Sequence, residues 1–142
     1  MAIVWRVEDE AKRVLGQRRA FRDCIASLAQ PPSDVDAAEL IYGELVANTV
    51  RYADGDVEVR LEVDDSCQPV LEVRDYGPGL KQRPRRQLDD LYAESGRGLG
   101  IVLRLARELA VGEAEGGGTV VRATLPVTPR TAGPKGARPT SC

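Results

Sequence analysis

The 142 residues, 42% hydrophobic and 30% charged, have the length and composition of one soluble globular domain rather than of a disordered chain. No apolar run approaches the roughly 20 residues that a helix needs to span a bilayer, and no secretory signal opens the sequence, so we expect a cytoplasmic protein without membrane contact. The net charge of −2 includes three basic residues and no acid in residues 127–142, and the acidic remainder argues against direct nucleic-acid binding.

The first third of the chain predicts one strand and two helices. Residues 3–7 alternate between apolar and polar side chains, which is typical of a strand. Apolar residues then recur at helical spacing over 10–30, and Pro31-Pro32 ends that pattern because proline has no amide hydrogen. Ser33 is typical of a helix N-cap, so we expect the next helix to span residues 33–53.

The remainder predicts a hairpin, a third helix and a second pair of strands. Residues 57–63 alternate strictly, and residues 70–73 return after a polar turn, so the two segments should pair in antiparallel fashion. A helix is predicted over 99–109, followed by strands over 109–113 and 119–125 that three glycines join. We expect one domain over 1–126 and a disordered tail over 127–142.

These elements together predict the fold class. About three helices against a mostly antiparallel mixed sheet favour a two-layer α+β sandwich with the helices on one face. Residues 81–94 have no clean period and lie between two glycine-rich segments. That segment is either a mobile lid or an ordinary exposed loop with a short helix. The three cysteines have no metal-ligand spacing and the sequence contains no histidine, so we expect three free thiols.

Three polar motifs are found on or beside these predicted helices and strands. On the central helix, Glu44, Asn48 and Arg51 fall within an arc of roughly 60° and would project from one edge. An ordinary solvated helix edge would have the same pattern. Two glycine-rich segments follow later in the chain: Val73-Arg74-Asp75-Tyr76-Gly77-Pro78-Gly79 and Ser95-Gly96-Arg97-Gly98-Leu99-Gly100-Ile101. The first of these is also typical of a plain turn.

In this order and at these separations, the three motifs resemble the ATP-binding domain shared by gyrase, the ninety-kilodalton heat-shock chaperones, histidine kinases and the mismatch-repair protein MutL. Within this GHKL, or Bergerat-fold, superfamily the sequence is most similar to the bacterial anti-sigma factor serine/threonine kinases. The resemblance covers about residues 4–126. It implies the Bergerat ATP-binding fold, with ATP and Mg²⁺ as cofactors.

The resemblance also implies a role for each motif. Asn48 occupies the position of the Mg²⁺ ligand, and a carboxamide oxygen suits that ion. Glu44 matches the general base, which acts on the group that attacks the γ-phosphate. Asp75 matches the carboxylate that accepts a hydrogen bond from the adenine amino group, with Gly77 and Gly79 allowing close approach to the base.

The remaining predicted nucleotide contacts surround these residues. The resemblance places the phosphates at a helix N-terminus, where backbone amides can meet them, and it provides cations and groups that lie against the base. The residues concerned are Arg51, Tyr52, Arg97, Gly98, Leu99, Gly100 and Thr119. For both arginines a solvated surface position remains an equal alternative.

The resemblance implies a kinase of the partner-switching kind. Such a protein sequesters a sigma factor or phosphorylates an anti-sigma-factor antagonist, and it forms a homodimer. One departure is Tyr52, because many anti-sigma factor kinases have histidine there. Two alternatives remain open: a non-catalytic, ATP-dependent binding module, and a stand-alone histidine-kinase-like ATPase domain whose phosphoacceptor histidine lies on another chain.

Overall fold

The computed structural model describes residues 2–52, 55–76 and 96–130, and for residues 50–52 and 96–99 it describes the backbone only. The elements follow in the order β1 (Ala2–Glu10), α1 (Ala11–Gly16), α2 (Arg18–Leu28), β2 (Ala29–Gln30), α3 (Val35–Tyr52), β3 (Asp56–Val63), β4 (Pro69–Asp75), α5 (Gly96–Leu105), β5 (Glu108–Glu113), β6 (Thr119–Thr124) and β7 (Thr128–Pro129). No described helix is long and apolar enough to cross a membrane.

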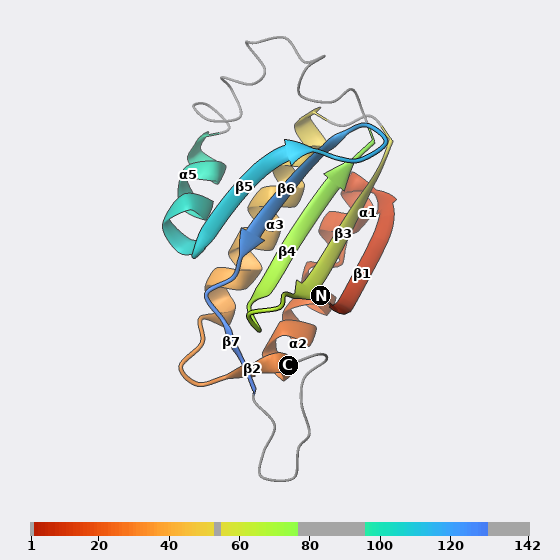
Figure 1. The fold of residues 1–142 in the computed structure, drawn as a ribbon. Helices are drawn as coiled ribbons and strands as arrows, with labels where there is room; N and C mark the ends of the chain where they lie inside the picture. Colours follow the sequence, from red (N-terminus) through yellow and green to blue (C-terminus); the bar gives the residue numbers. More distant parts are fainter. Residues whose placement is uncertain (1, 53–54, 77–95, 131–142) are drawn as a thin grey trace.

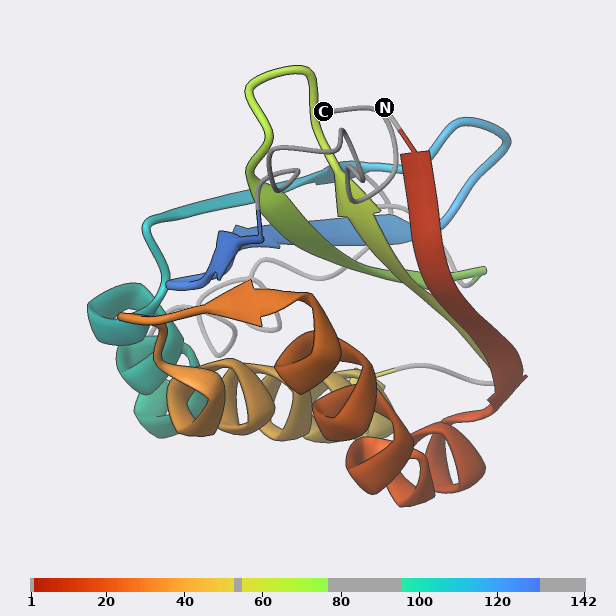
Figure 2. The same ribbon diagram turned by 90° about the horizontal axis from the view of Figure 1, so that it is seen from below.

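The described elements form two layers. Five antiparallel strands make one sheet in the order β1-β3-β4-β6-β5, and β2 pairs with β7 in a separate ladder. The helices cover one face of the large sheet, as Figures 1 and 2 show from two directions. The predicted two-layer α+β sandwich is therefore confirmed.

The core lies between the sheet and the central helix α3. Val57, Val59, Leu61 and Val63 of β3 are fully buried, as the alternation of that strand predicts. Tyr42 of α3 stacks on Phe21 with ring centroids 4.6 Å apart, and its hydroxyl donates a hydrogen bond to the backbone carbonyl of Val14. Burial raises the pKa of Tyr42. The Phe21 and Val14 contacts fix α3 against α2 and α1.

The first predicted helix differs from the structure in two ways. It is interrupted at Gln17, whose backbone angles (φ −84°, ψ 7°) separate α1 from α2. It also ends at Leu28, because Ala29 turns to extended geometry and pairs with Pro129 of β7. The apolar period continues through both points, so periodicity alone did not indicate them.

The start of α3 also differs from the prediction. The helix begins at Val35, and the Asp34 carboxylate accepts a hydrogen bond from the Ala37 amide at 2.9 Å. Asp34 is therefore the N-cap and the expectation for Ser33 was wrong. The Ser33 hydroxyl instead accepts a hydrogen bond from the Thr128 amide at 3.0 Å.

The end of the third helix and the start of the C-terminal tail also differ from the prediction. α5 ends at Leu105 rather than at residue 109, because residues 108–113 pair with β6 as β5. The expected tail began at residue 127, but Val127 is fully buried and β7 follows it, so the ordered chain continues at least to Arg130. Cys24 is a free thiol as expected, whereas Cys67 is disulfide-bonded, which corrects the expectation for that residue.

Candidate functional site

Several element ends meet at one end of the molecule. In Figure 1 the C-terminal ends of α3, β4 and β5 and the N-terminal ends of β6 and α5 all lie toward the top, which we call the upper end. The predicted site residues that the structure describes belong to these ends: the last turns of α3, the last residue of β4, the first residue of β6 and the first turns of α5. The fold therefore gathers motifs that are far apart in the sequence.

Asp75 and Thr119 are in direct contact at the upper end. The Thr119 backbone amide donates a hydrogen bond to Asp75 Oδ1 at 3.2 Å. Both residues are buried, with exposed fractions of 6% and 4%. Thr119 Oγ1 is also buried, and within the described part of the chain it has no hydrogen-bond partner. A carboxylate and a hydroxyl thus lie together where strands β4 and β6 meet.

Gly118 allows this contact to form. Its φ of +89° lies in the left-handed region, and a Cβ atom built on it would lie only 2.0 Å from the Asp75 carbonyl oxygen. Any side chain at position 118 would have to displace the backbone of β4. From the sequence, the three glycines of 116–118 were expected only to join two strands. The run of glycines was nevertheless a feature that could have indicated a close backbone approach.

Glu44 and Asn48 lie one turn apart on α3, and both are half-buried. Asn48 Oδ1 is buried and finds no hydrogen-bond partner among the described residues. Its neighbour Thr49 is different, since its hydroxyl bonds to the Leu45 carbonyl at 2.9 Å. Leaving a buried acceptor unpaired is unfavourable, and an amide oxygen is a hard ligand of the kind that Mg²⁺ takes. The Asn48 carboxamide therefore fits the predicted metal ligand.

The other predicted contacts are described only in part. The backbone of Arg51 and Tyr52 forms the last turn of α3, and Arg97, Gly98 and Leu99 lie in the first turn of α5, which begins at Gly96. The first amides of a helix have no partner within the helix and favour anions. A Cβ on Gly100 would meet no atom within 4 Å, so the described packing does not require glycine there. Gly77, Gly79 and the predicted lid over 81–94 lie outside the described residues.

The described residues contain no group of three or more histidine, cysteine, aspartate or glutamate side chains that could hold a metal ion. Mg²⁺ keeps several waters and binds nucleotide phosphates, so it does not require such a group.

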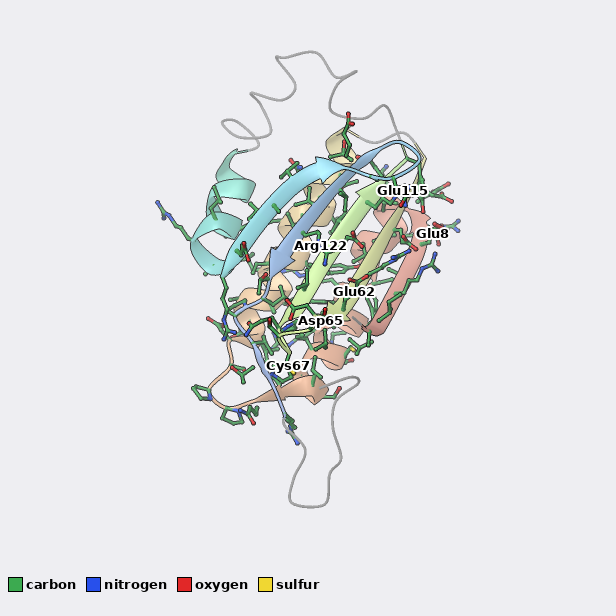
Figure 3. All side chains as sticks on the ribbon, viewed as in Figure 1. Glu8, Glu62, Asp65, Cys67, Glu115 and Arg122 are labelled. Atoms are coloured by element: carbon green, nitrogen blue, oxygen red, sulfur yellow. The ribbon has the colours of Figure 1, made fainter. Side chains whose placement is uncertain are left out.

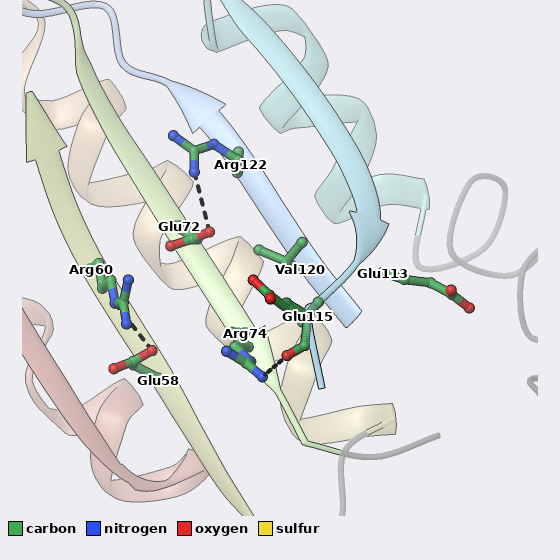
Figure 4. Close-up of a pocket in the computed structure, with 9 residues that line it drawn as sticks. Glu58, Arg60, Glu72, Arg74, Glu113, Glu115, Val120 and Arg122 are labelled. Carbon is green, nitrogen blue, oxygen red and sulfur yellow. Dashed lines mark hydrogen bonds and ion pairs between the residues drawn. The ribbon is translucent and has the colours of Figure 1, made fainter. Parts of the chain in front are cut away.

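A separate pocket of about 330 Å³ opens on the sheet face that points away from the helices, which we call the outer face. Figure 3 shows side chains on this face, among them Glu62 and Arg122. The lining residues are Glu58, Arg60, Glu72, Arg74, Glu113, Ala114, Glu115, Val120 and Arg122. Figure 4 shows ion pairs of Arg60 with Glu58 and of Arg122 with Glu72, at 3.1 and 3.2 Å.

This outer-face pocket does not suit a triphosphate. Its four carboxylates outnumber its three guanidinium groups, so the lining would repel a polyanion. It also contains none of the predicted site residues. The predicted site residues that the structure describes lie at the upper end instead.

Comparison with known proteins adds a family and two relatives. The family described as histidine kinase-like ATPase domain matches residues 7–125. The sensor histidine kinase YxdK of Bacillus subtilis (strain 168) is 32% identical over 107 residues, which are 63% of this chain and 33% of that protein. This chain thus spans a third of that relative. The histidine kinase AdeS of Acinetobacter baumannii has a similar fold, with a TM-score of 0.51, 18% identity, and coverage of 87% of this chain and 68% of that one.

Proposed function

This chain belongs to the histidine kinase-like ATPase family, and on that premise we propose that it binds ATP with Mg²⁺ at the upper end and transfers the γ-phosphoryl group to a protein partner. One observation carries the proposal. Polar groups from α3, β4 and β6 lie buried at one end of the fold, and two of their atoms, Asn48 Oδ1 and Thr119 Oγ1, lack hydrogen-bond partners among the described residues. Buried polar atoms of this kind are satisfied when a polar ligand binds.

In this proposal β4 and β6 bind the base. Asp75 accepts a hydrogen bond from the adenine amino group, and the Thr119 hydroxyl lies beside it to support the same base. The sequence resemblance also assigns Gly77 and Gly79 to the base site, and both lie outside the described residues. An adenine at this position would satisfy the unpaired Thr119 oxygen, which nothing in the described protein does.

The helices α3 and α5 bind the metal and the phosphates. Asn48 provides an oxygen ligand to Mg²⁺, and the backbone amides of Gly98, Leu99 and Gly100 receive the phosphates at the start of α5. The sequence resemblance also assigns Arg51, Arg97 and Tyr52 to this site, and their side chains lie outside the described part of the structure. Calorimetry with ATP, in the presence and absence of Mg²⁺, tests this arrangement. A folded protein that gives no heat with millimolar nucleotide would exclude it.

Glu44 points to a transfer reaction rather than to binding alone. It lies one turn before Asn48, where a carboxylate would orient and deprotonate a nucleophile directed at the γ-phosphate. A hydroxyl nucleophile makes the chain a serine/threonine kinase of the anti-sigma factor type. Its partners are then a sigma factor or an anti-sigma-factor antagonist, and the active form is a homodimer.

The names of the two relatives favour a histidine, rather than a serine or threonine, as the acceptor of the phosphoryl group. Both are named as histidine kinases, so this chain is alternatively a histidine-kinase-like ATPase domain. The sequence contains no histidine, so the acceptor must then lie outside it. Labelled ATP distinguishes the two: acid-stable label on a co-purified partner supports serine or threonine, and acid-labile label supports histidine. ATP-dependent partner binding without any transfer supports the binding module.

A further inference from the structure

Arg74 lies one residue before Asp75 and points to the opposite side of the sheet. Successive side chains of a strand alternate between faces, so Asp75 faces the buried upper-end site while Arg74 lines the outer-face pocket. The Arg74 Nη2 atom donates a hydrogen bond to the backbone carbonyl of Glu115 at 2.6 Å. Figure 4 shows this contact, which joins the end of β4 to the turn between β5 and β6.

The turn over residues 114–118 is therefore held to β4 from both faces. On the outer face Arg74 bonds to Glu115, and on the inner face Asp75 bonds to the Thr119 amide. Between these two contacts Gly118 lies directly against the Asp75 backbone. The turn also closes on itself, because the Ala114 amide donates to the Gly118 carbonyl at 2.9 Å. A displacement of the turn would therefore also displace Thr119.

Arg74 is directed to the turn rather than to a carboxylate. Glu58 lies directly opposite it in the β3–β4 register, yet Glu58 pairs with Arg6 and Arg60. Within the described residues no ion pair joins Arg74 to a carboxylate, and its buried Nε has no hydrogen-bond partner. A guanidinium placed only for stability would be expected to take the acid opposite it. Arg74 instead holds the backbone carbonyl of Glu115.

A second contact fixes the guanidinium itself. Arg74 Cζ lies 4.8 Å from the centroid of the Tyr76 ring, which is cation–π geometry. The Tyr76 hydroxyl donates a hydrogen bond to the Glu8 carboxylate of β1 at 2.6 Å. A chain of contacts thus runs across the outer face from β1 through Tyr76 and Arg74 to the turn.

We propose that Arg74 is a positioning residue for the nucleotide base. From the outer face Arg74 holds the 114–118 turn, and the turn holds Thr119 against Asp75 in the arrangement that selects adenine. The inference rests on the proposed function, since it names a determinant of base specificity for the same site. Arg74 itself does not contact the nucleotide.

The test compares Arg74→Met, which keeps an apolar stem but loses the donor, with Arg74→Lys, which keeps a donor. Arg60→Met is the matched control, because Arg60 lies on the same face and pairs with Glu58 rather than with the turn. Affinities are measured by calorimetry for ATP and for purine riboside triphosphate, which lacks the 6-amino group that Asp75 would bind.

We expect Arg74→Met to weaken ATP binding about tenfold, equivalent to ~1.4 kcal/mol, and to leave the affinity for purine riboside triphosphate unchanged. Arg74→Lys should restore most of the loss, and Arg60→Met should have no effect on selectivity.

Amide exchange of Thr119 in the nucleotide-free protein provides a second readout, and it should accelerate in Arg74→Met but not in Arg60→Met. Unchanged ATP affinity and unchanged exchange in Arg74→Met would overturn the inference while the wild type still binds ATP. Equal weakening of both nucleotides by both methionine variants would also overturn it, because that result indicates general destabilisation. Absence of ATP binding by the wild type would instead overturn the proposed function.

Discussion

The Thr119 amide and the Asp75 carboxylate, 44 residues apart in the sequence, are joined by a hydrogen bond of 3.2 Å in the interior of the protein. The bond connects the end of β4 to the start of β6 and leaves the Thr119 hydroxyl buried beside the acid. The two residues thus form a buried polar site that joins β4 to β6.

Asp75→Asn should weaken ATP binding by ~1.5–3 kcal/mol, the range for a hydrogen bond to a charged group, while the protein stays folded. Calorimetry measures the affinity and circular dichroism checks the fold. Glu72→Gln is the control, because Glu72 lies on the same strand but pairs with Arg122 on the outer face. Equal affinities for wild type and Asp75→Asn would remove Asp75 from the site.

Gly118→Ala should destabilise the protein more than Gly117→Ala. Both residues have positive φ, of +89° and +108°, so both substitutions incur the ~1–2 kcal/mol cost of a left-handed residue. Only at Gly118 would the new Cβ lie 2.0 Å from a backbone oxygen, whereas at Gly117 it meets nothing within 4 Å. Urea denaturation measures both losses. Similar values for the two variants would contradict the close approach of the turn to β4.

Asn48→Leu should separate stability from function. Asn48 Oδ1 is buried and unpaired in the described protein, so an apolar side chain of similar size is expected to keep or raise the melting temperature. The same change removes the proposed Mg²⁺ ligand, so the enhancement of ATP affinity by Mg²⁺ should disappear. Thermal melts and titrations with and without the metal measure the two effects. A large drop in melting temperature would indicate a structural role for Asn48.

A chain ending at Pro126 should be less stable than one ending at Arg130. The shorter chain loses Val127, whose burial is worth ~1.5–3 kcal/mol, and the β2–β7 pairing. It also loses the hydrogen bond from the Arg130 amide to the Leu28 carbonyl at 2.8 Å. Denaturant titrations of the two chains measure the difference, and coincident curves would show that β7 contributes nothing to the free energy of unfolding.

Glu44→Ala should abolish phosphoryl transfer and leave ATP affinity nearly unchanged, because the carboxylate acts on the attacking group and not on the nucleotide. Labelled ATP with a co-purified partner measures transfer, and calorimetry measures binding. Glu39→Ala, five residues earlier on α3, is the control, because Glu39 pairs with Arg18 and Arg22 on the surface. Transfer that survives in Glu44→Ala would exclude Glu44 as the base.

Local patterns predicted much of this structure. The alternation over residues 57–63 fixed which side chains of β3 face the core, and the end of the apolar run placed Asp75 at the end of β4. Both inferences depend on periods of a few residues, which the sequence displays directly. The order of the three motifs also indicated the superfamily, which the match over residues 7–125 supports.

Contacts between distant segments were decided only by the tertiary structure. The β1–β3 and β4–β6 pairings, the pairing of Ala29 with Pro129, and the approach of Gly118 to Asp75 each join residues more than 40 positions apart. Nothing in the local sequence around Arg74 distinguishes it from other strand arginines, because its role depends on the Glu115 carbonyl that the fold brings to it. Helix periodicity likewise continued through Ala29, where the backbone turns to extended geometry and pairs with Pro129 of a later strand. The sequence determined which residues are candidates for the site, and the packing of strands β4 and β6 brought two of them, Asp75 and Thr119, into contact.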